Sequence, residues 1–581
     1  METLYNNRSQ FWILALLFMS TLGRPVIAQQ SKPAITQKLL TAIKTNDLPK
    51  VQKLIENHRI NPDTLLKDNK RQAPLLMFAA HYGGLAMVKY LISKGANYQK
   101  KGILVFGKKE DDWYGSLLTI AVGNGKFDLL KYLLEELKIP VNDRGMSIYR
   151  GLEYTALYVA IVRQNIKLAR YLILLEADVN LLYGNNNLTV VVVACGKPGN
   201  YAILKLLLQN GAKQVPYGEN KMPISIAARY GDVKMVKLLI KYGAETEVVT
   251  AEGLNLLHMA ALGDHNAQMM KFLLQGLQLN PAIVTQSGMT PLMLAMRASK
   301  LTTVRLLIKK GANIKAQDKD EWTALHYAVR YSRHKLVQWF FDQGMKPKPL
   351  NDDGTTLAHV AAKYSDMAMV KTLRKNGVNL NQENFTGILP VYTALRSQKN
   401  KIARFLLNQG KISKAKLTEC LYQVPVYGQA DIIKLLVIKG AAIEGESWRD
   451  KTPLLRVAWD SRGKAANIKT LVNLGANVNA RSRDDQSTPL LEVLDGGWPK
   501  LEIVRFLVNK GAKINVKDKS GNTPLLNAVL WADISIVRFL VNRGANIHVT
   551  DNQEHNALYY AFRKGKTKIV KFLIEKGAIR E

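Results

Sequence analysis

A glycine returns along this chain at a nearly constant interval. From Gly211 onward the steps are 30 to 36 residues long, and most are 33. The positions are Gly211, Gly243, Gly276, Gly311, Gly344, Gly377, Gly410, Gly440, Gly475, Gly511, Gly544 and Gly577. A fixed period of this length indicates a repeat architecture, in which each unit buries its apolar face only against its neighbours. A chain of 581 residues also exceeds what one core usually supports, about 250 to 300 residues.

Each period holds two short helical patterns and a loop. An apolar helical segment precedes the glycine, as in Ile503-Val504-Arg505-Phe506-Leu507-Val508. A shorter segment before it opens with Thr-Pro-Leu, as at Thr488-Pro489-Leu490. Threonine caps a helix start, proline is tolerated in the first turn, and glycine ends a helix in a left-handed turn. The pattern therefore predicts two antiparallel helices in each unit.

The segments Leu257-His258-Met259-Ala260-Ala261, Thr323-Ala324-Leu325-His326-Tyr327-Ala328 and Gly475-Ala476-Asn477-Val478-Asn479-Ala480 resemble the ankyrin repeat. The resemblance covers about residues 35 to 581. It implies an all-α fold: an α-solenoid of about 16 stacked ankyrin-like helix-turn-helix repeats with short hairpin loops. The run Val190 to Val193 would suit a strand in isolation, but its place in the period predicts a helix.

We divide the predicted array at a weak repeat. Residues 35–410 form the first part, with degenerate early repeats, and residues 451–581 form the C-terminal part. Residues 411–450 between them are a poor match, and Pro425 stands where the family has a helical alanine. The stretch 411–428 is thus the candidate kink or boundary between two sub-arrays. Two insertions, residues 101–114 and 143–153, are expected to lengthen connections.

Residues 1–28 read as a signal peptide. Arg8 precedes an apolar run of twelve residues, Pro25 follows it, and cleavage is expected after Ala28. A transmembrane anchor is the alternative, but a span needs about 20 apolar residues. Arrays with such a signal resemble bacterial periplasmic or secreted proteins, so we expect export to the periplasm or the medium and no transmembrane span. Lysine and arginine number 82 against 46 acidic residues, a net charge of +36 that favours anionic partners.

The motifs of enzymes and metal sites are missing from the sequence. The nearest match is Gly565-Lys566-Thr567, but Tyr560 stands where a phosphate loop needs glycine. His258, His326 and His359 share one repeat position, and the resemblance implies hydrogen bonds between neighbouring repeats rather than a metal site. Cys195 and Cys420 are about seven repeats apart, so we expect two buried thiols and no disulfide. We predict no catalytic residue, metal or cofactor.

The ankyrin resemblance also implies where a partner binds. In that family the two residues after the Ala-Ala pair of the first helix face the concave groove, and here basic and aromatic residues recur in that slot. The candidate partner-binding residues are His81, Tyr82, Arg163, Arg229, Tyr230, Arg297, Arg330, Tyr331, Lys363, Tyr364, Arg396, Tyr427, Trp531 and Arg563. Arginine and tyrosine often dominate binding energies. The alternative is that composition and packing alone produce the pattern.

These patterns favour a non-catalytic scaffold for protein–protein interaction. We expect a monomer that holds an acidic macromolecular partner on its concave face and takes no small-molecule substrate. The alternative is a general binder of an anionic polymer or surface, such as polysaccharide, nucleic acid or anionic lipid, whose affinity would fall steeply with salt. An enzyme is the third possibility, but no segment outside the repeats is long enough for a catalytic domain.

Overall fold

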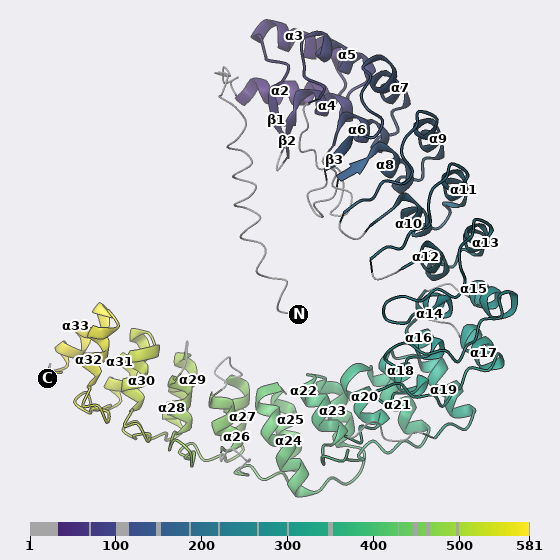
Figure 1. Ribbon diagram of the computed structural model, residues 1–581. Helices are drawn as coiled ribbons and strands as arrows, with labels where there is room; N and C mark the ends of the chain where they lie inside the picture. The colour runs from purple at the N-terminus through teal and green to yellow at the C-terminus, as the bar shows by residue number, and fades with distance from the viewer. Residues whose placement is uncertain are drawn as a thin grey trace. The chain divides into compact units, whose positions relative to one another are not determined.

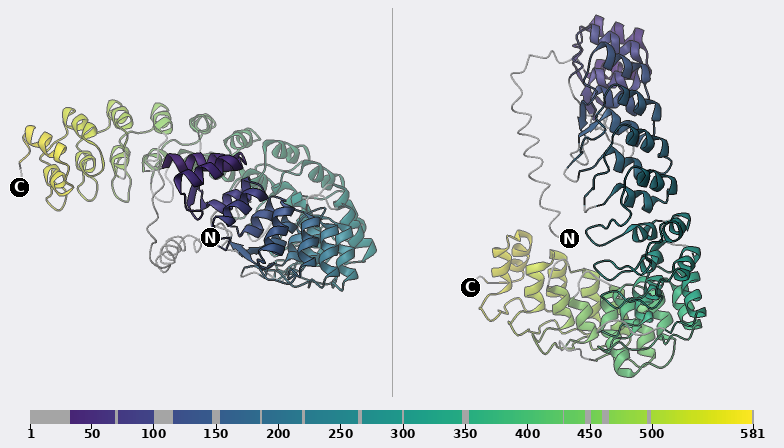
Figure 2. Two further views of the ribbon diagram at one scale, coloured as in Figure 1. Left: turned by 90° about the horizontal axis from the view of Figure 1, so that it is seen from above. Right: turned by 45° about the vertical axis from the view of Figure 1, so that its right-hand side comes forward.

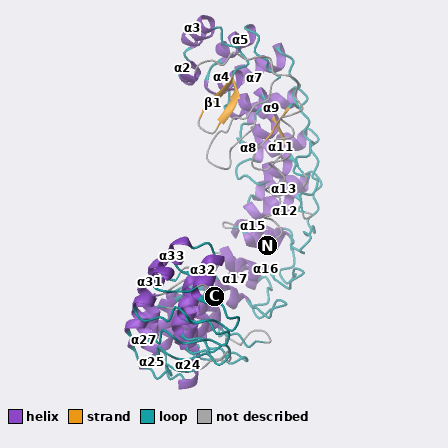
Figure 3. Ribbon diagram, turned by 90° about the vertical axis from the view of Figure 1, so that its left-hand side faces the viewer, coloured by secondary structure: helices purple, strands orange, loops and turns teal. Residues whose placement is uncertain are grey.

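The computed structural model forms two compact units, Met1–Met259 and Ala260–Glu581. Helices dominate both units (Figure 3). The structure describes residues 33–68, 71–99, 115–146, 153–184, 187–218, 221–263, 267–298, 301–346, 353–427, 429–445, 451–459, 465–495 and 499–579. The predicted signal peptide and the insertion at 101–114 lie outside these residues. Among the described residues, no helix has the length and apolar character that a membrane crossing requires.

The first unit consists of helix pairs with two added strand pairs (Figure 1). Its helices are α2 (Pro33–Lys44), α3 (Leu48–His58), α4 (Leu75–Tyr82), α5 (Leu85–Ser93), α6 (Leu117–Gly123), α7 (Phe127–Lys131) with a π-helical turn (Tyr132–Glu136), α8 (Ala156–Val162), α9 (Ile166–Leu174), α10 (Val190–Cys195), α11 (Tyr201–Gln209), α12 (Pro223–Tyr230) and α13 (Val233–Lys241). The run that begins at Val190 is thus helical, as predicted. Helix α14 (Leu256–Leu262) spans the division between the units.

The strands of the first unit form two antiparallel hairpins. Strand β1 (Leu65–Asp68) pairs with β2 (Arg71–Pro74), so that Leu65 lies opposite Pro74. Strand β3 (Arg144–Met146) pairs with β4 (Glu153–Thr155), so that Arg144 lies opposite Thr155. Strand β3 lies in the predicted insertion at 143–153 and β4 begins at its last residue, so the described part of the insertion adds backbone pairing before α8.

The second unit continues the alternation of first and second helices. After α15 (Ala267–Lys271) and a π-helical turn (Phe272–Gly276), its helices are α16 (Pro291–Ala298), α17 (Leu301–Lys309), α18 (Ala324–Arg330), α19 (His334–Asp342), α20 (Leu357–Tyr364), α21 (Met367–Lys375), α22 (Pro390–Arg396), α23 (Asn400–Leu407), α24 (Lys414–Tyr427), α25 (Ala430–Ile438), α26 (Pro453–Trp459), α27 (Ala465–Asn473), α28 (Pro489–Leu494), α29 (Leu501–Asn509), α30 (Pro524–Trp531), α31 (Ile534–Asn542), α32 (Ala557–Arg563) and α33 (Thr567–Glu575). Figure 2 shows the helix pairs of its C-terminal part side by side.

Stacking of like helices builds the core of the second unit. Helix α18 packs against α16 and α20, and α22 packs against α20 and α24. The first helices are nearly all apolar and buried, while the second helices bury one stripe, such as Leu336, Val337 and Phe340 in α19. The stretch 411–428, which the sequence marks as a candidate boundary, holds the 14-residue α24, and α24 contacts both α22 and α26. The division into two units falls between Met259 and Ala260.

Each helix pair closes at a residue in the left-handed backbone conformation, and this residue is not always glycine. Gly311 has a φ of 99°, as the period predicts, whereas Lys138, Glu176 and Gln278 hold the equivalent turn with φ of 56°, 64° and 52°. The prediction that Gly276 ends its helix pair in a left-handed turn is therefore wrong. Gly276 ends the π-helical turn, where the N–H of Leu277 bonds to the carbonyl of Phe272, and this wider turn moves the left-handed position to Gln278.

Glu176 and Gly311 provide a matched pair of stability tests. Two backbone bonds close each turn. In the first, the N–H groups of Glu176 and Ala177 donate to the carbonyls of Ile173 and Leu172. In the second, those of Gly311 and Ala312 donate to the carbonyls of Ile308 and Leu307. We expect Glu176→Gly to stabilise its hairpin by about 1 kcal/mol, since glycine removes the Cβ penalty of the left-handed region. We expect Gly311→Ala to destabilise by about 1 kcal/mol through backbone strain alone, because a Cβ there meets no atom within 4 Å. Hydrogen exchange of the Ala177 and Ala312 amides measures both; equal signs would contradict the argument.

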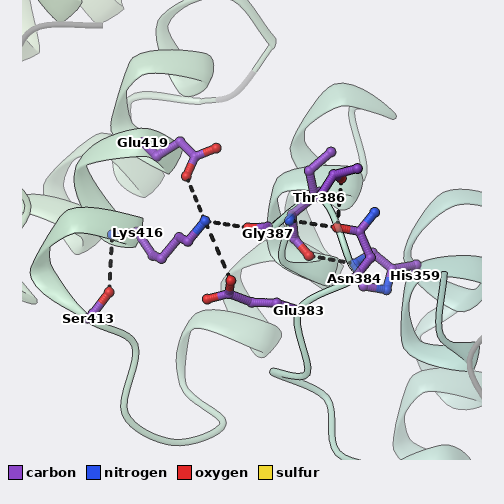
Figure 4. Close-up of polar contacts among 9 residues, drawn as sticks. His359, Glu383, Asn384, Thr386, Gly387, Ser413, Lys416 and Glu419 are labelled. Atoms are coloured by element: carbon purple, nitrogen blue, oxygen red, sulfur yellow. Dashed lines mark hydrogen bonds and ion pairs between the residues drawn. The ribbon is translucent and has the colours of Figure 1, made fainter. Parts of the chain in front are cut away.

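His359 confirms the inter-repeat role that the ankyrin resemblance implies. Its Nδ1 accepts the backbone N–H of Thr356 at 3.2 Å. Its Nε2 bonds to the carbonyl of Ile388 before the next helix pair at 2.9 Å (Figure 4). In the same loop, Asn384 accepts the N–H of Ile388 at 2.7 Å, and Lys416 bonds to the carbonyl of Gly387. These bonds fix one hairpin loop against the first helices on either side.

Acid is expected to break the bond from Thr356 to His359, because a proton on Nδ1 removes the acceptor of the Thr356 N–H. Burial lowers the pKa of the His359 imidazole, and the bond to Ile388 opposes that shift only in part. The unfolded chain then binds the proton more readily than the folded chain, so stability falls as the pH drops from about 6.5 toward the lowered pKa. We expect the protection of the Thr356 amide, relative to the unfolded chain at the same pH, to fall over this window in the native chain and to change less in His359→Gln. An identical pH response of the two proteins would contradict the assignment.

Candidate partner-binding surface

Basic and aromatic side chains meet at the ends of α18 and α20. The guanidinium carbon of Arg330 lies 4.5 Å from the ring centroid of Tyr364, 5.6 Å from that of Trp322 and 5.9 Å from that of Tyr331. The ammonium of Lys363 lies 5.0 Å from the centroid of Tyr364. We call Trp322, Arg330, Tyr331, Lys363 and Tyr364 the central cluster. Four of its members were predicted from the sequence, and the structure brings them together.

A buried carboxylate positions the fifth member, Trp322. Asp318, which is 9% exposed, accepts the backbone N–H of Trp322 at 2.8 Å and that of Asp320 at 3.0 Å. The phenol of Tyr327, inside α18, donates to the other oxygen of Asp318 at 2.6 Å, and burial with this bond raises the pKa of Tyr327. The hairpin loop is thereby tied to α18, and Trp322 is held beside Arg330.

Arg330 is a half-buried cation that lacks an ion pair among the described residues. Its contacts there are the three rings of the central cluster, and Lys363 likewise contacts a ring and no carboxylate of the described chain. Cation–π contacts hold a guanidinium in place without neutralising it. A fixed and uncompensated positive charge against flat apolar surface suits an incoming carboxylate with an apolar neighbour.

The cations of the central cluster belong to a longer series. Arg297, Arg330, Lys363 and Arg396 follow one another at intervals of 33 residues and lie at the C-terminal ends of α16, α18, α20 and α22. These first helices pack in succession, so the four charges lie one helix apart along one edge of the second unit. We call these four residues the cationic stripe.

The other predicted residues of the second unit lie outside the central cluster. Trp531 ends α30 and is 45% exposed, with the ammonium of Lys564 5.4 Å from its ring centroid. Arg563 ends α32 and is exposed. The side chain of Tyr427 lies outside the described residues. Trp531 and Lys564 form a smaller pair of the same chemical type.

In the first unit, the predicted partner-binding residues lie at the same helix ends, and some of them pack against other residues of the chain. Asn124 donates to Nδ1 of His81 at 2.9 Å, and Tyr82 stacks on Phe78 with centroids 6.4 Å apart. Arg163, Arg229 and Tyr230 are exposed at the ends of α8 and α12. The first unit therefore presents these two arginines at exposed helix ends.

A second set of cations has a structural role that the sequence does not reveal. Lys126 donates to the carbonyls of Ala80 and His81 in the preceding hairpin at 2.9 and 2.8 Å, and Lys566 donates to those of Leu530 and Ala532 at 3.2 and 2.9 Å. Arg333 and Lys399 make equivalent bonds to carbonyls of the preceding hairpin. These residues cap helix C-termini across repeats, and burial lowers the pKa of Lys126, Lys399 and Lys566. Lys566, the lysine of the near match to a phosphate loop, thus serves as a cap.

The two thiols are in environments that disfavour nucleophilic chemistry. Cys195 and Cys420 are free and buried, as predicted, and burial raises the pKa of Cys195 and raises that of Cys420 to about 12. A thiol with a raised pKa is a poor nucleophile at neutral pH. Among the described residues, histidine, cysteine and acidic side chains form no cluster of three that would hold a metal ion.

The sequence pattern did not indicate Trp322 as a surface residue. Trp322 precedes the helix cap Thr323, whereas the predicted surface positions follow the Ala-Ala pair. The sequence Asp318-Lys319-Asp320-Glu321-Trp322 could have indicated it, because an aspartate four residues before an aromatic residue suits a capped turn.

Comparison with known proteins identifies the repeat. The family model described as ankyrin repeats in three copies matches residues 118–217, 191–282, 224–318, 257–350, 325–418 and 497–580, and the single-repeat model matches 73–102. The chain is 34% identical over 111 residues to palmitoyltransferase AKR1 of Lachancea kluyveri, 19% of this chain and 15% of that protein. It is 23% identical over 296 residues to ankyrin repeat protein nuc-2 of Neurospora crassa, 50% of this chain and 23% of that protein.

A viral relative shares the same repeats. The chain is 26% identical over 185 residues to ankyrin repeat protein FPV031 of fowlpox virus, which is 31% of this chain and 54% of that protein. The chain thus spans less than two thirds of the length of each of these curated relatives. The matches to the family models cover well over half of the chain, and their positions follow the helix pairs of the structure. The chain therefore belongs to the ankyrin-repeat family.

Proposed function

We propose that this chain is a non-catalytic scaffold that binds an acidic protein partner through the central cluster and the cationic stripe. The observation that carries the proposal is the half-buried Arg330 guanidinium, enclosed by three rings and without an ion pair among the described residues. Binding hot spots are enriched in arginine, tyrosine and tryptophan. Ankyrin repeats support a role in protein–protein interaction.

Two observations support the non-catalytic part of the proposal. The matched segment of palmitoyltransferase AKR1 covers 15% of that protein. The described cysteines are buried with raised pKa values, Lys566 caps a helix and Arg330 contacts rings. These environments suit packing and recognition.

We propose, in addition, that the chain is exported after cleavage behind Ala28. The support is the sequence pattern of residues 1–28 alone, and the organisms of the matched relatives do not indicate a bacterial source. Intact mass of the protein recovered from its native compartment tests this point. A mature chain that begins at Gln29 supports export, and a chain that retains residues 1–28 contradicts it.

The main experiment is a capture with matched variants. Residues 29–581 are immobilised, and the proteins retained from the native extract are identified by mass spectrometry at rising salt. The stripe variant carries Arg297→Glu, Arg330→Glu, Lys363→Glu and Arg396→Glu. The off-stripe control carries Lys309→Glu, Lys371→Glu, Lys401→Glu and Lys434→Glu, four exposed residues of the second helices, so both variants have the same net charge.

The proposal expects one protein that survives moderate salt on the wild type and the off-stripe control and is lost from the stripe variant. Ring contacts persist when salt screens the charges, which is why retention through moderate salt is expected. If all three proteins retain the same mixture and release it together as salt rises, the scaffold proposal fails. The chain would then bind polyanions through its overall charge.

A further inference from the structure

The cationic stripe has a spacing that a ligand must match. Its members follow at 33, 33 and 33 residues, and each occupies the last or the second-to-last position of its helix. Neighbouring packed helices lie about 8–10 Å apart. The stripe therefore presents one positive charge about every 9 Å along four consecutive first helices of the second unit.

The central pair of charges is consistent with this spacing. The guanidinium carbon of Arg330 is 4.5 Å from the Tyr364 centroid, and the ammonium of Lys363 is 5.0 Å from the same centroid. The two charges share one ring, so their separation cannot exceed the sum of these distances. The ring of Trp322 is 6.5 Å from that of Tyr364, and Arg330 contacts both rings.

Three peptide conformations can be compared with the stripe. In a β-strand, side chains on one face repeat about every 6.7 Å, which is too short. In an α-helix, residues seven apart lie about 10.5 Å apart, but their direction drifts by about 20° in each heptad. In a polyproline II helix, every third residue lies on the same face and the repeat is about 9 Å. Only the polyproline II helix matches both the spacing and a constant direction.

Aromatic rings favour the same conformation. Proline-rich polyproline II segments bind to surfaces lined by aromatic side chains, because the rings contact the flat pyrrolidines. Tyr364 provides such a ring in contact with both central charges, and Trp322 and Tyr331 provide two more beside Arg330. The conformation is also largely formed before binding, so little chain entropy is lost.

We propose that the partner's binding segment is a peptide in the polyproline II conformation with an aspartate or glutamate at every third position. Its carboxylates pair with Arg297, Arg330, Lys363 and Arg396 in turn, and its intervening apolar residues contact the rings of the central cluster. This inference rests on the proposed scaffold function and specifies the ligand of the same surface.

The test uses two peptides of one composition. The first is Glu-Pro-Pro repeated four times, and the second contains the same four glutamates and eight prolines with glutamate at every second position. Both carry the same charge and a fluorescent label, and both are titrated with residues 29–581 at physiological ionic strength. We expect the period-three peptide to bind about tenfold more tightly, since it aligns more of its carboxylates with the stripe.

The stripe variant and the off-stripe control complete the test. The preference for the period-three peptide should disappear in the stripe variant and persist in the off-stripe control. Equal affinity of the two peptides for the wild type, or a preference that the stripe variant retains, would overturn the inference. So would a sulfated polysaccharide that competes with both peptides equally.

The peptide result and the capture result fail independently. If the stripe variant loses a protein partner but the wild type shows no period-three preference, the scaffold function stands and the ligand assignment is wrong. If the period-three preference is present but capture is unaffected by the stripe variant, the peptide site exists and the proposed partner does not use it.

Discussion

Substitution of Lys451 by methionine is expected to destabilise the contact between α26 and α28 by about 3 kcal/mol at neutral pH. Lys451 donates to Glu492 at 2.6 Å, and the Glu492 side chain is only 3% exposed. Asp485 lies 3.8 Å from the same ammonium. Removal of one partner of a buried ion pair leaves the other charge in an apolar environment, which costs about 3–5 kcal/mol. The partial exposure of Lys451, at 16%, favours the lower end of that range.

The loss should shrink as the pH falls. Burial raises the pKa of the Glu492 carboxyl, and the bond from Lys451 opposes this. Without Lys451 the folded state holds the Glu492 proton more tightly than the unfolded state does. The variant therefore regains stability as the pH drops through the raised pKa, because the buried group becomes neutral.

Hydrogen exchange of amides in α26 and α28 measures the effect locally, because a long repeat array does not unfold in one step. The control is the double variant Lys451→Met with Glu492→Leu, which removes both charges and should lie close to the wild type. A single variant that costs no more than the double variant would show that the ion pair is not coupled to the core.

Reversal of the four charges of the cationic stripe is expected to weaken binding of the captured partner at least about a hundredfold. Each reversed residue replaces an attraction by a repulsion, and hot-spot residues alone often contribute about 2 kcal/mol or more. None of the four side chains donates a hydrogen bond within the described residues, so the fold should persist. Circular dichroism and thermal unfolding check this.

Arg330 should dominate that loss. A lysine in its place keeps the charge but lacks the planar group that contacts three rings. Arg330→Lys is therefore expected to lose much of the affinity that Arg330→Ala loses, measured as the Kd for the captured partner. Full affinity in Arg330→Lys would show that charge alone matters at this position.

The repeat period and the helix pairs could be predicted from the sequence because both depend on local patterns. Thr488 caps α28 as its Thr-Pro-Leu motif indicates, and Gly311 adopts the left-handed turn. Gln278 could not be recognised as a closing residue, because the π-helical turn before it displaces the turn by two residues from Gly276. A widened turn leaves no clear mark in the hydrophobic pattern.

The candidate surface was predictable in part for a related reason. Arg330 and Lys363 occupy a slot of the repeat that sequence alignment alone can locate. The place of Trp322 depends on hydrogen bonds of Asp318 to the backbone, and the role of Lys566 depends on carbonyls of the preceding hairpin. A sequence does not show which backbone groups a side chain contacts. Only the structure could therefore separate the cations available for binding from those that cap helices.

The most direct test of the central claim is a titration of the captured partner against the stripe variant and the off-stripe control, which have equal net charge. The account predicts a Kd near the wild-type value for the off-stripe control and a Kd at least about a hundredfold higher for the stripe variant. Equal weakening of both variants would contradict the account and assign the binding to the overall positive charge of the chain.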